Sequence, residues 1–380
     1  MAHQTGNRGC KNSMTRTSIE WVRNQDGSQG FTVNPIRFRN KATGKVGHYC
    51  EKVSPGCKYC YASRMQTGPY LSGLEFIAEN KDRGELFFDE AVLQQVIRRQ
   101  KPSTFFWCDM TDLFGPWVSD KWQDRITAVC SLTPQHRHLW LTKRAKEMRE
   151  YFTELQDGRV DDVYEAATDM AHADFRNTAY LQSKADRLID NWPLSNLGLG
   201  VSAEDQDRAY ERIPNLLMTP AAMRYMSGEP LLGALEVSHW LTQWTGRNSS
   251  LPKPLSTALA TLPDIHGLDW VITGGETGLG ARPMPPEWPR AIRDQCQQAK
   301  VPYFHKHNGE WSPMCENFHK VSNHTYSHDT LAWNRDGTPY NAFNPPAGSF
   351  PSRMMYRVGK KAAGRKLDGR TWDELPEMLR

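Results

Sequence analysis

Long apolar runs are missing from this chain of 380 residues. It has no stretch of about 18 apolar residues, as a membrane-spanning helix would need, and its polar N-terminus lacks the apolar stretch of a secretory signal. A surplus of one charge is missing too, because 47 basic residues stand against 43 acidic ones. Charge therefore singles out neither nucleic acid nor a membrane as partner, and we expect a cytoplasmic protein without membrane contact.

Cysteines are few, and three of the eight fall within the stretch HYCEKVSPGCKYCYASR, residues 48–64. Because thiols stay reduced in the cytoplasm, Cys50, Cys57 and Cys60 are predicted to be ligands or reactive groups rather than disulfide partners. The remaining cysteines are scattered, and we expect ordinary buried or surface thiols at Cys10, Cys108, Cys130, Cys296 and Cys315.

Two inorganic centres suit the Cys-x6-Cys-x2-Cys spacing. Three thiolates could bind three irons of a [4Fe-4S] cluster and leave the fourth iron open to a small molecule. With His48, the same thiolates could instead complete a tetrahedral zinc site, although such sites more often show two closely spaced pairs. Three buried thiols without any ligand are the third interpretation, and all three stay open on spacing alone.

From about residue 100 the sequence repeats one pattern, in which a short apolar run is followed by a polar loop and an amphipathic segment. The pattern indicates an α/β protein, with parallel strands joined by crossover helices. The expected strands lie in 103–114, 137–144, 197–205, 223–232, 268–278 and 301–311. The expected helices are 90–100, 118–132, 145–156, 204–217 and 285–300.

The sum of these segments predicts a (β/α) barrel, full or partial, over residues 48–311. Two stretches interrupt the rhythm and are interpreted as insertions, either a lid or surface decoration, at 157–195 and 233–265. Residues 1–47 are expected to form a partly disordered N-terminal extension, and residues 312–380 a C-terminal extension.

The cysteine motif resembles that of radical S-adenosylmethionine enzymes, although its first gap is longer than is usual there. In those enzymes three cysteines bind a [4Fe-4S] cluster, and S-adenosylmethionine chelates the fourth iron. An aromatic residue before the last cysteine lies near the adenine, and Tyr59 occupies that place. The resemblance therefore implies a radical-SAM-like barrel, a [4Fe-4S] cluster and S-adenosylmethionine as cofactor.

The wider chain looks like an uncharacterised phage- and prophage-borne family of three-Cys-motif proteins with radical-SAM-like character. The resemblance runs from about Ser18 to Trp311 and rests on several blocks in register, among them CEKVSPGCKYCYA, DMTDLFG, LTKR, SGEPLL and GGETGLGARPM. The last block reads KHNGEW, where a form like KQWGEW is expected. The family supplies no established reaction.

The loops that follow parallel strands gather on one face, so polar residues at strand ends are the expected site. Candidates for catalysis are Asp112, Lys143 and Glu229, although Asp112 could cap a helix and Glu229 could pair with Arg224. Beside Tyr59, the candidates for cofactor binding are Ser202, Glu204, Arg144, Gly274, Gly275 and Glu276.

Two of these candidates, Gly274 and Gly275, form with Glu276 a Gly-Gly-Glu element. It resembles the element with which radical S-adenosylmethionine enzymes bind the methionyl amine. A glycine pair that lets the chain turn tightly off a strand explains Gly274 and Gly275 equally well.

The leading hypothesis for function is a radical S-adenosylmethionine enzyme that generates a 5′-deoxyadenosyl radical, with electrons from a flavodoxin- or ferredoxin-like reductant. The expected substrate is DNA, RNA or a nucleotide, because the resembling family is phage-borne and the tail is basic at Lys360, Lys361, Arg365 and Lys366. One alternative is a zinc-stabilised nucleic-acid-binding or nuclease-like phage protein without radical chemistry. Another is a catalytically silent barrel that serves as adaptor for a phage-encoded partner protein.

Overall fold

The computed structural model describes residues 14–173, 178–186, 192–242, 266–313, 330–333, 339–341 and 353–380. Cys10, Cys315, the expected disorder before residue 14 and most of the second predicted insertion lie outside these ranges. The chain forms two compact units. Unit 1 comprises Met1–Ser202, Glu211–Tyr225 and Pro376–Arg380, and unit 2 comprises Ala203–Tyr210 and Met226–Leu375.

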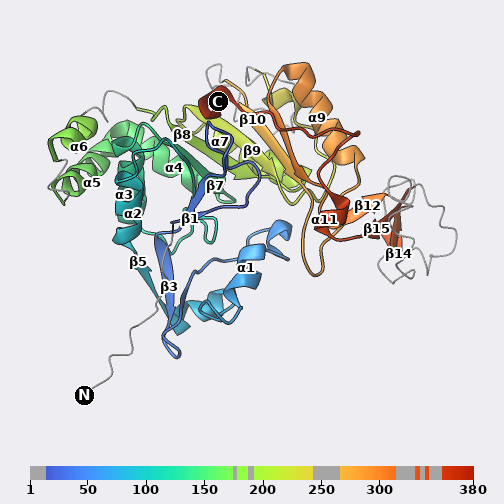
Figure 1. Ribbon diagram of the computed structural model, residues 1–380, viewed down its shortest axis with the longest axis horizontal. Helices are drawn as coiled ribbons and strands as arrows, with labels where there is room; N and C mark the ends of the chain where they lie inside the picture. The colour runs from blue at the N-terminus through green and yellow to red at the C-terminus, as the bar shows by residue number, and fades with distance from the viewer. Residues whose placement is uncertain are drawn as a thin grey trace. The chain divides into compact units, whose positions relative to one another are not determined.

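A largely parallel sheet forms the centre of unit 1 (Figure 1). Its strands β2, β6, β7 and β8 run parallel, and the short strand β1 pairs antiparallel at the edge. Every residue of β6, TFFW, is buried, as expected for an inner strand covered on both faces. In the order of the sheet, the strands are β1 (Met14–Arg16), β2 (Phe31–Val33), β6 (Thr104–Trp107), β7 (Arg137–Thr142) and β8 (Leu197–Ser202).

Strand β8 carries a glycine because a neighbouring ring lies against it. A Cβ atom at Gly200 would come within 2.4 Å of the Tyr225 ring. The Tyr225 hydroxyl donates a hydrogen bond to the carbonyl of Trp140 on β7, at 2.9 Å. Tyr225 belongs to β9 (Met223–Gly228), within which the chain passes from unit 1 to unit 2. A second passage falls within α7 (Gln206–Leu217).

Helices and a small sheet complete unit 1. Helix α3 is buried along much of its length and packs against α2, α5 and α6, as Figure 1 shows. The helices are α1 (Tyr61–Gln66), α2 (Glu90–Ile97), α3 (Asp120–Leu132), α4 (Ala145–Glu154), α5 (Val160–Ala173) and α6 (Thr178–Ala185). Shorter helical turns are Pro55–Cys57, Ala78–Arg83, Leu155–Arg159 and Glu377–Leu379. A three-stranded antiparallel sheet comprises β3 (Ile36–Asn40), β4 (Val46–Gly47) and β5 (Gly84–Phe88).

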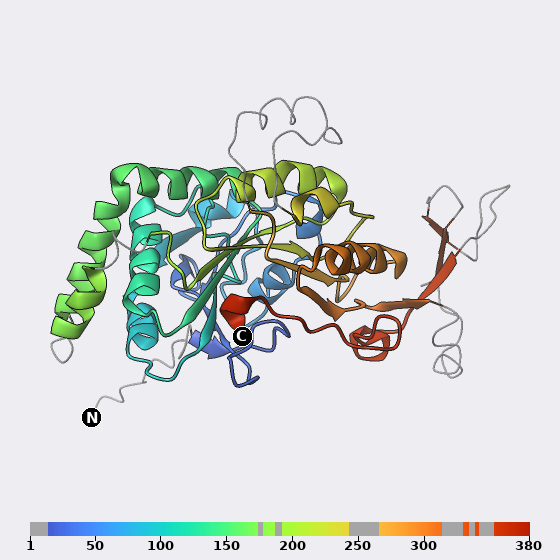
Figure 2. The same ribbon diagram turned by 90° about the horizontal axis from the view of Figure 1, so that it is seen from above.

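Unit 2 is built around a parallel strand pair and a helix. Strand β10 (Trp270–Gly274) pairs parallel with β11 (Tyr303–His307), and α9 (Glu287–Ala299) packs along both (Figure 2). A separate antiparallel sheet has the order β12-β15-β13-β14. Its strands are β12 (Trp311–Pro313), β13 (Thr330–Trp333), β14 (Pro339–Asn341) and β15 (Arg353–Arg357). The remaining helical segments are Ser238–Trp240 and α11 (Lys360–Ala363).

The expected alternation of strands and helices is confirmed. Each strand predicted from residue 103 onward contains one of β6 to β11, and each predicted helix contains one of α2, α3, α4, α7 and α9. The chain is thus an α/β protein with a largely parallel sheet, whereas closure into a full or partial barrel stays a prediction. Strand β2 joins this sheet from a segment that we assigned to an N-terminal extension. Among the described residues, no helix is long and apolar enough to cross a membrane.

Candidate functional site

The three clustered cysteines lie in unit 1, between β4 and α1. All are free thiols on half-buried residues. Cys50 and Cys60 pack against the same small apolar cluster, which comprises Ala62, Phe76 and Met110. Burial raises the pKa of the Cys50 thiol above its ordinary value, and the charges of Asp112, Cys60 and Cys57 act in the same direction.

Hydrogen bonds fix this segment to the loop that follows β6. The Tyr61 hydroxyl, one residue after Cys60, donates to the Asp109 carbonyl at 2.9 Å and to Asp109 Oδ2 at 3.1 Å. Asn34, just after β2, donates through Nδ2 to Asp109 Oδ1 at 2.6 Å. The Thr111 hydroxyl donates to the Tyr49 carbonyl, one residue before Cys50. Both ends of the cysteine motif are thus fastened at the carboxyl ends of parallel strands.

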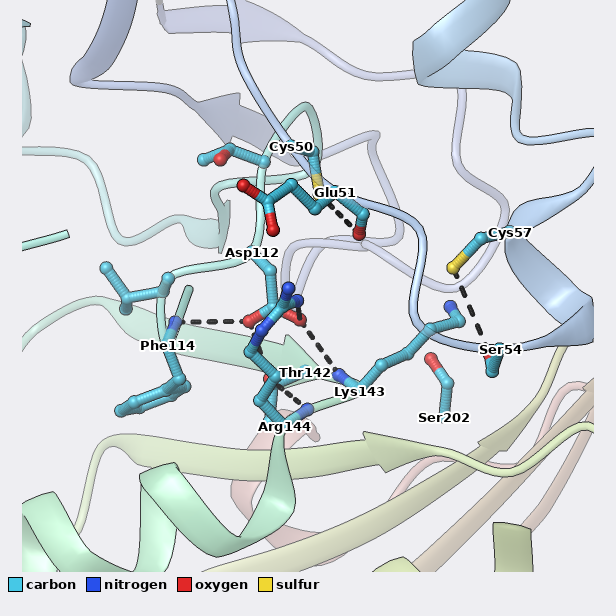
Figure 3. A network of polar contacts seen from close by, with 12 residues as sticks. Cys50, Glu51, Ser54, Cys57, Asp112, Phe114, Thr142, Lys143, Arg144 and Ser202 are labelled. Carbon is cyan, nitrogen blue, oxygen red and sulfur yellow. Dashed lines mark hydrogen bonds and ion pairs between the residues drawn. The ribbon is translucent and has the colours of Figure 1, made fainter. Parts of the chain in front are cut away.

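Asp112 organises the end of β7 (Figure 3). Its Oδ1 accepts hydrogen bonds from the Thr142 hydroxyl at 2.6 Å and the Phe114 amide at 3.1 Å. Its Oδ2 accepts from the Lys143 amide at 3.1 Å and faces Arg144 Nη1 at 3.4 Å. These contacts favour a positioning role for Asp112, which is not the N-cap of either neighbouring helix, because Ser119 precedes α3 and Arg144 precedes α4.

The Arg144 guanidinium contacts two neighbouring side chains. Besides facing Asp112, its guanidinium lies 4.7 Å from the ring centre of Trp117, and both ends of the ion pair are buried. Lys143 is only half-buried. Figure 3 shows its side chain extending from the end of β7 toward the segment that holds Ser54 and Cys57. Of the two predicted cations, Lys143 is therefore the better placed to meet a ligand.

Ser202, at the end of β8, lies in the same view of unit 1 (Figure 3). It is buried, and its carbonyl accepts a hydrogen bond from Arg212 Nη1 at 2.8 Å. Tyr59 is half-buried, and the Lys58 ammonium lies 5.2 Å from the centre of its ring. The expected contact of Tyr59 with adenine stays a prediction.

A second group of predicted residues belongs to unit 2. Glu229 follows β9, and its Oε1 lies 2.5 Å from Lys306 Nζ and 3.6 Å from His307 Nε2. The alternative partner of Glu229, Arg224, donates to the Thr219 carbonyl instead. Glu229 therefore belongs to a cluster of ionisable groups at the ends of β9 and β11.

The Gly-Gly-Glu element of unit 2 has structural partners. A Cβ atom at Gly275 would meet the backbone of Gly309 at 2.7 Å and of Asn308 at 2.8 Å. Glu276 forms a bidentate pair with Arg282, whose Nε lies 2.8 Å from Oε2 and whose Nη2 lies 2.5 Å from Oε1. A Cβ atom at Gly274 would only touch Glu229 and Lys306, at 3.4 Å. The contacts of Gly275 and Glu276 match the structural alternative, in which the two glycines allow the chain to turn tightly after β10.

Glu204, which follows β8, is a fully buried residue. Its carbonyl accepts a hydrogen bond from the Leu232 amide at 2.7 Å. Because unit 2 contains Glu204, Glu229 and Glu276, whereas unit 1 contains the cysteines, Lys143 and Ser202, the predicted residues form two groups.

The donor atoms that the cysteine segment offers to a metal are three free thiols. Within the described ranges, no group of three or more His, Cys, Asp or Glu side chains is arranged to hold a metal ion. The donor set itself fits an iron–sulfur cluster, because three thiols on one short segment are the ligands that such clusters take. His48 Nδ1 lies 3.1 Å from the Ile36 carbonyl, a contact that zinc-ligating histidines commonly make while Nε2 binds the metal, so His48 does not decide between zinc and the cluster. Burial and the charge of Arg37 lower the pKa of His48 to about 3.

Sequence reasoning missed the residues that hold this site together. Asn34, Thr111 and Thr142 donate the hydrogen bonds described above, and none was predicted as a site residue, although Thr111 and Thr142 lie in the blocks DMTDLFG and LTKR. A signal for two of them exists, because Asn34 directly follows β2 and Thr142 ends β7. Polar residues at the carboxyl ends of parallel strands are candidates for a site in any α/β protein.

The fold and site define an α/β protein with reduced thiols beside a polar group at the carboxyl edge of a parallel sheet. The chain belongs to the family described as "Protein of unknown function (DUF5131)", whose pattern matches residues 34–376. No curated protein matches it. A mutant of spore photoproduct lyase is similar among solved structures, with a TM-score of 0.30 and 12% identity over 93% of this chain and 81% of that one. So weak a likeness carries no argument about fold or chemistry.

Proposed function

We propose that this protein is a radical S-adenosylmethionine enzyme, with Cys50, Cys57 and Cys60 as ligands of a [4Fe-4S] cluster. The observation that carries the proposal is the fastening of the three-thiol segment, through Tyr61 and Thr111, to the loop after β6. The three thiols thus lie at the edge where α/β proteins bind their ligands, which supports a role as cluster ligands. When bound, the cluster would supply the electron that cleaves S-adenosylmethionine into methionine and a 5′-deoxyadenosyl radical.

The side chains of unit 1 would bind and orient the cofactor. Lys143 would pair with the methionyl carboxylate, because Arg144 is already paired with Asp112. Tyr59 would contact the adenine, and the Ser202 hydroxyl would bind a sugar hydroxyl. Asp112 would fix the backbone that carries Lys143. The protein's contribution is to hold the substrate hydrogen near the radical and to exclude water.

The proposed substrate is a nucleic-acid base or a nucleotide. Support comes from the exposed lysines of the C-terminal segment, Lys360, Lys361 and Lys366, which could follow a phosphate backbone. Within unit 2, Glu229 with Lys306 and His307 is the group that we propose for proton transfer, because carboxylate, ammonium and imidazole meet there.

The first experiment is an anaerobic purification followed by measurement of iron, sulfide and zinc. We expect about four irons per chain, and formation of 5′-deoxyadenosine when dithionite and S-adenosylmethionine are added. Cys57→Ala should abolish both, whereas His48→Asn, which can still donate to the Ile36 carbonyl, should retain the cluster. About one zinc per chain, with metal lost equally in both variants and no cleavage, would establish the zinc-stabilised alternative.

A further inference from the structure

The loop that follows β10 in unit 2 carries an exposed leucine. Leu279 lies in the block GGETGLGARPM, and its exposed fraction is 81%. Among the described residues of unit 2, no other large apolar side chain is exposed. A single exposed leucine is common on protein surfaces, so a role for Leu279 depends on how the chain holds it and on what surrounds it.

Leu279 occupies the first central position of a tight turn. The Ala281 amide closes the turn by donating a hydrogen bond to the Gly278 carbonyl at 3.0 Å. Gly280, at the second central position, has a φ of 79°, as a type II turn requires. Gly278 also lies in the left-handed region, with a φ of 86°. A glycine on each side thus lets the backbone fold back beneath Leu279.

Side chains from two other segments hold this turn in place. The Gly278 amide donates to Glu310 Oε1 at 2.6 Å, and Arg357 Nη2 donates to the Gly278 carbonyl at 2.7 Å. The Trp311 indole donates to the Ala281 carbonyl at 2.7 Å. Glu310 and Arg357 are both half-buried and lie 3.3 Å apart. The tip of the turn is therefore preorganised, which lowers the entropic cost of a contact made there.

Basic side chains adjoin the turn. The amides of Val358 and Gly359 donate to the Glu310 carbonyl at 2.8 and 3.0 Å. The start of α11 therefore lies beside the same residue that binds the turn. Helix α11 begins with Lys360 and Lys361, and both side chains are exposed.

The acidic side chains that contact this loop are paired with arginines. Glu276 forms the bidentate pair with Arg282, and Glu310 pairs with Arg357. The nearest exposed carboxylate along the chain after the turn is Glu287, at the start of α9 and eight residues beyond the tip. Exposed positive charge therefore borders the leucine, whereas the carboxylates in contact with its loop are neutralised.

An apolar tip beside exposed lysines suits a duplex nucleic acid. Leucine is one of the side chains that proteins insert between base steps, which partly unstacks the bases, and lysines pair with the flanking phosphates. An enzyme that acts on a base within a duplex must take that base out of the stack. A protein interface would instead bury a core of several apolar side chains, and Leu279 has no exposed apolar neighbour in the described part of unit 2.

The same loop starts at the ionisable group of unit 2. The Gly275 amide donates to the carbonyl of His307 at 3.0 Å, and His307 follows Lys306, the partner of Glu229. Leu279 comes four residues after Gly275, so the two backbones are at most about 14 Å apart. A base displaced by the tip would therefore leave the stack near the group that we propose for proton transfer.

We propose that Leu279 is a wedge that enters the base stack of a duplex nucleic acid, while Lys360 and Lys361 contact its phosphates. The inference rests on the proposed function and adds how a duplex substrate is opened. One base leaves the stack, and the leucine side chain fills the gap. No covalent bond forms or breaks in this step.

The test measures unstacking and binding on the anaerobically purified protein, without turnover. The probe is a DNA duplex with one mismatched 2-aminopurine, which fluoresces more strongly once unstacked, and a mismatched base costs least to unstack. The unchanged protein should raise the fluorescence. Leu279→Ala should abolish the rise and weaken duplex binding by about tenfold, with binding of the single strand unchanged. Leu279→Met, which keeps a side chain able to act as a wedge, should retain both.

Two further variants serve as controls. Tyr180→Ala removes an exposed apolar side chain of unit 1, with an exposed fraction of 57%, and should change neither readout. Lys360→Gln/Lys361→Gln should weaken binding of the duplex and of the single strand alike. It should also reduce the slope of log K against log salt for the duplex by about 1.8.

The outcomes separate the wedge from the proposed function. Duplex binding without a rise in fluorescence, or with an equal rise in Leu279→Ala, would overturn the wedge alone. No binding of duplex or single strand would overturn the nucleic-acid substrate and the wedge with it. Failure of the radical chemistry appears only in the dithionite assay, which contains no nucleic acid.

Two parallel measurements identify the partner. A rise that occurs with an RNA duplex alone, and is lost in Leu279→Ala, would assign the wedge to RNA. Conversion of a dimer into a monomer by Leu279→Ala in sedimentation would show a protein contact and refute the wedge.

Discussion

The side chain of His138 is held in one protonation state. Trp107 Nε1 donates a hydrogen bond to His138 Nδ1 at 3.0 Å, so this nitrogen carries no proton. His138 Nε2 lies 3.0 Å from the Thr133 hydroxyl, which itself donates to the Val129 carbonyl at 2.6 Å. The Nε2 proton therefore points to Thr133 Oγ1. A second proton on the ring would break the bond from Trp107, and burial lowers the pKa of His138 well below its ordinary value.

Three other buried histidines also have lowered pKa values and are therefore neutral in the folded protein. Burial lowers the pKa of His48 to about 3 and the pKa values of His136 and His305 to about 4. In the unfolded chain these groups titrate near pH 6.5, so between that pH and about 4 the unfolded state binds more protons. The free energy of unfolding is therefore unaffected by these histidines above pH 6.5. It falls as the pH drops from 6.5 towards 4, because protonation then favours the unfolded chain.

We expect the free energy of unfolding to drop between pH 7.5 and pH 5.5. The loss should be about 1.4 kcal/mol for each such histidine. Urea unfolding at both pH values measures it. His138→Asn, which cannot titrate, should show a smaller loss, whereas His266→Asn, an exposed histidine, should match the unchanged protein. Equal stability at the two pH values would show that these rings are not held neutral.

At the scale of elements, apolar runs of the later strands predicted the parallel sheet because β6 to β11 are buried on both faces. The three residues of β2 carry no periodic signal. Their place in the sheet depends on pairing with β6, as Phe31 with Phe105, which lies far along the sequence. The cysteine motif was readable because its ligands are neighbours in sequence, whereas the bonds that fasten it join Asn34 and Tyr61 to Asp109.

The Gly-Gly-Glu element shows the limit of local patterns. Gly275 resembles part of a cofactor motif, yet the loop after β10 approaches the backbone of Asn308 and Gly309, and only a residue without Cβ fits. Gly275→Ala should therefore lower the free energy of unfolding by about 1–3 kcal/mol, because neither backbone can retreat. Urea unfolding at pH 7.5 measures the change.

A matched control for Gly275→Ala is Gly233→Ala. Gly233 also belongs to unit 2, has an ordinary backbone conformation, and a Cβ atom there would have its nearest neighbour at 3.7 Å. It should lose little stability. If both variants unfold at the same urea concentration, close packing does not explain the glycine, and its role in cofactor binding regains support.

At the scale of the whole molecule, the basic residues of the C-terminal segment are of two kinds, arginines in ion pairs within unit 2 and exposed lysines. Arg357 lies 3.3 Å from Glu310, and Arg365 pairs with Asp373 and donates to the His305 carbonyl at 3.3 Å. These arginines hold unit 2 together. The sequence grouped Arg365 with the lysines because composition cannot tell a half-buried cation from an exposed one. Lys360, Lys361 and Lys366 are exposed.

Exchange of these lysines for glutamine separates the two kinds of cation. If the lysines contact phosphates, Lys360→Gln/Lys361→Gln/Lys366→Gln should weaken binding of a DNA duplex and reduce the slope of log K against log salt by about 2.7. Fluorescence anisotropy between about 50 and 200 mM salt measures both effects. Arg365→Gln should instead lower the urea midpoint, because its partner Asp373 loses its counter-charge. A triple variant with an unchanged salt slope would remove the lysines from any nucleic-acid interface, and with them the structural support for such a substrate.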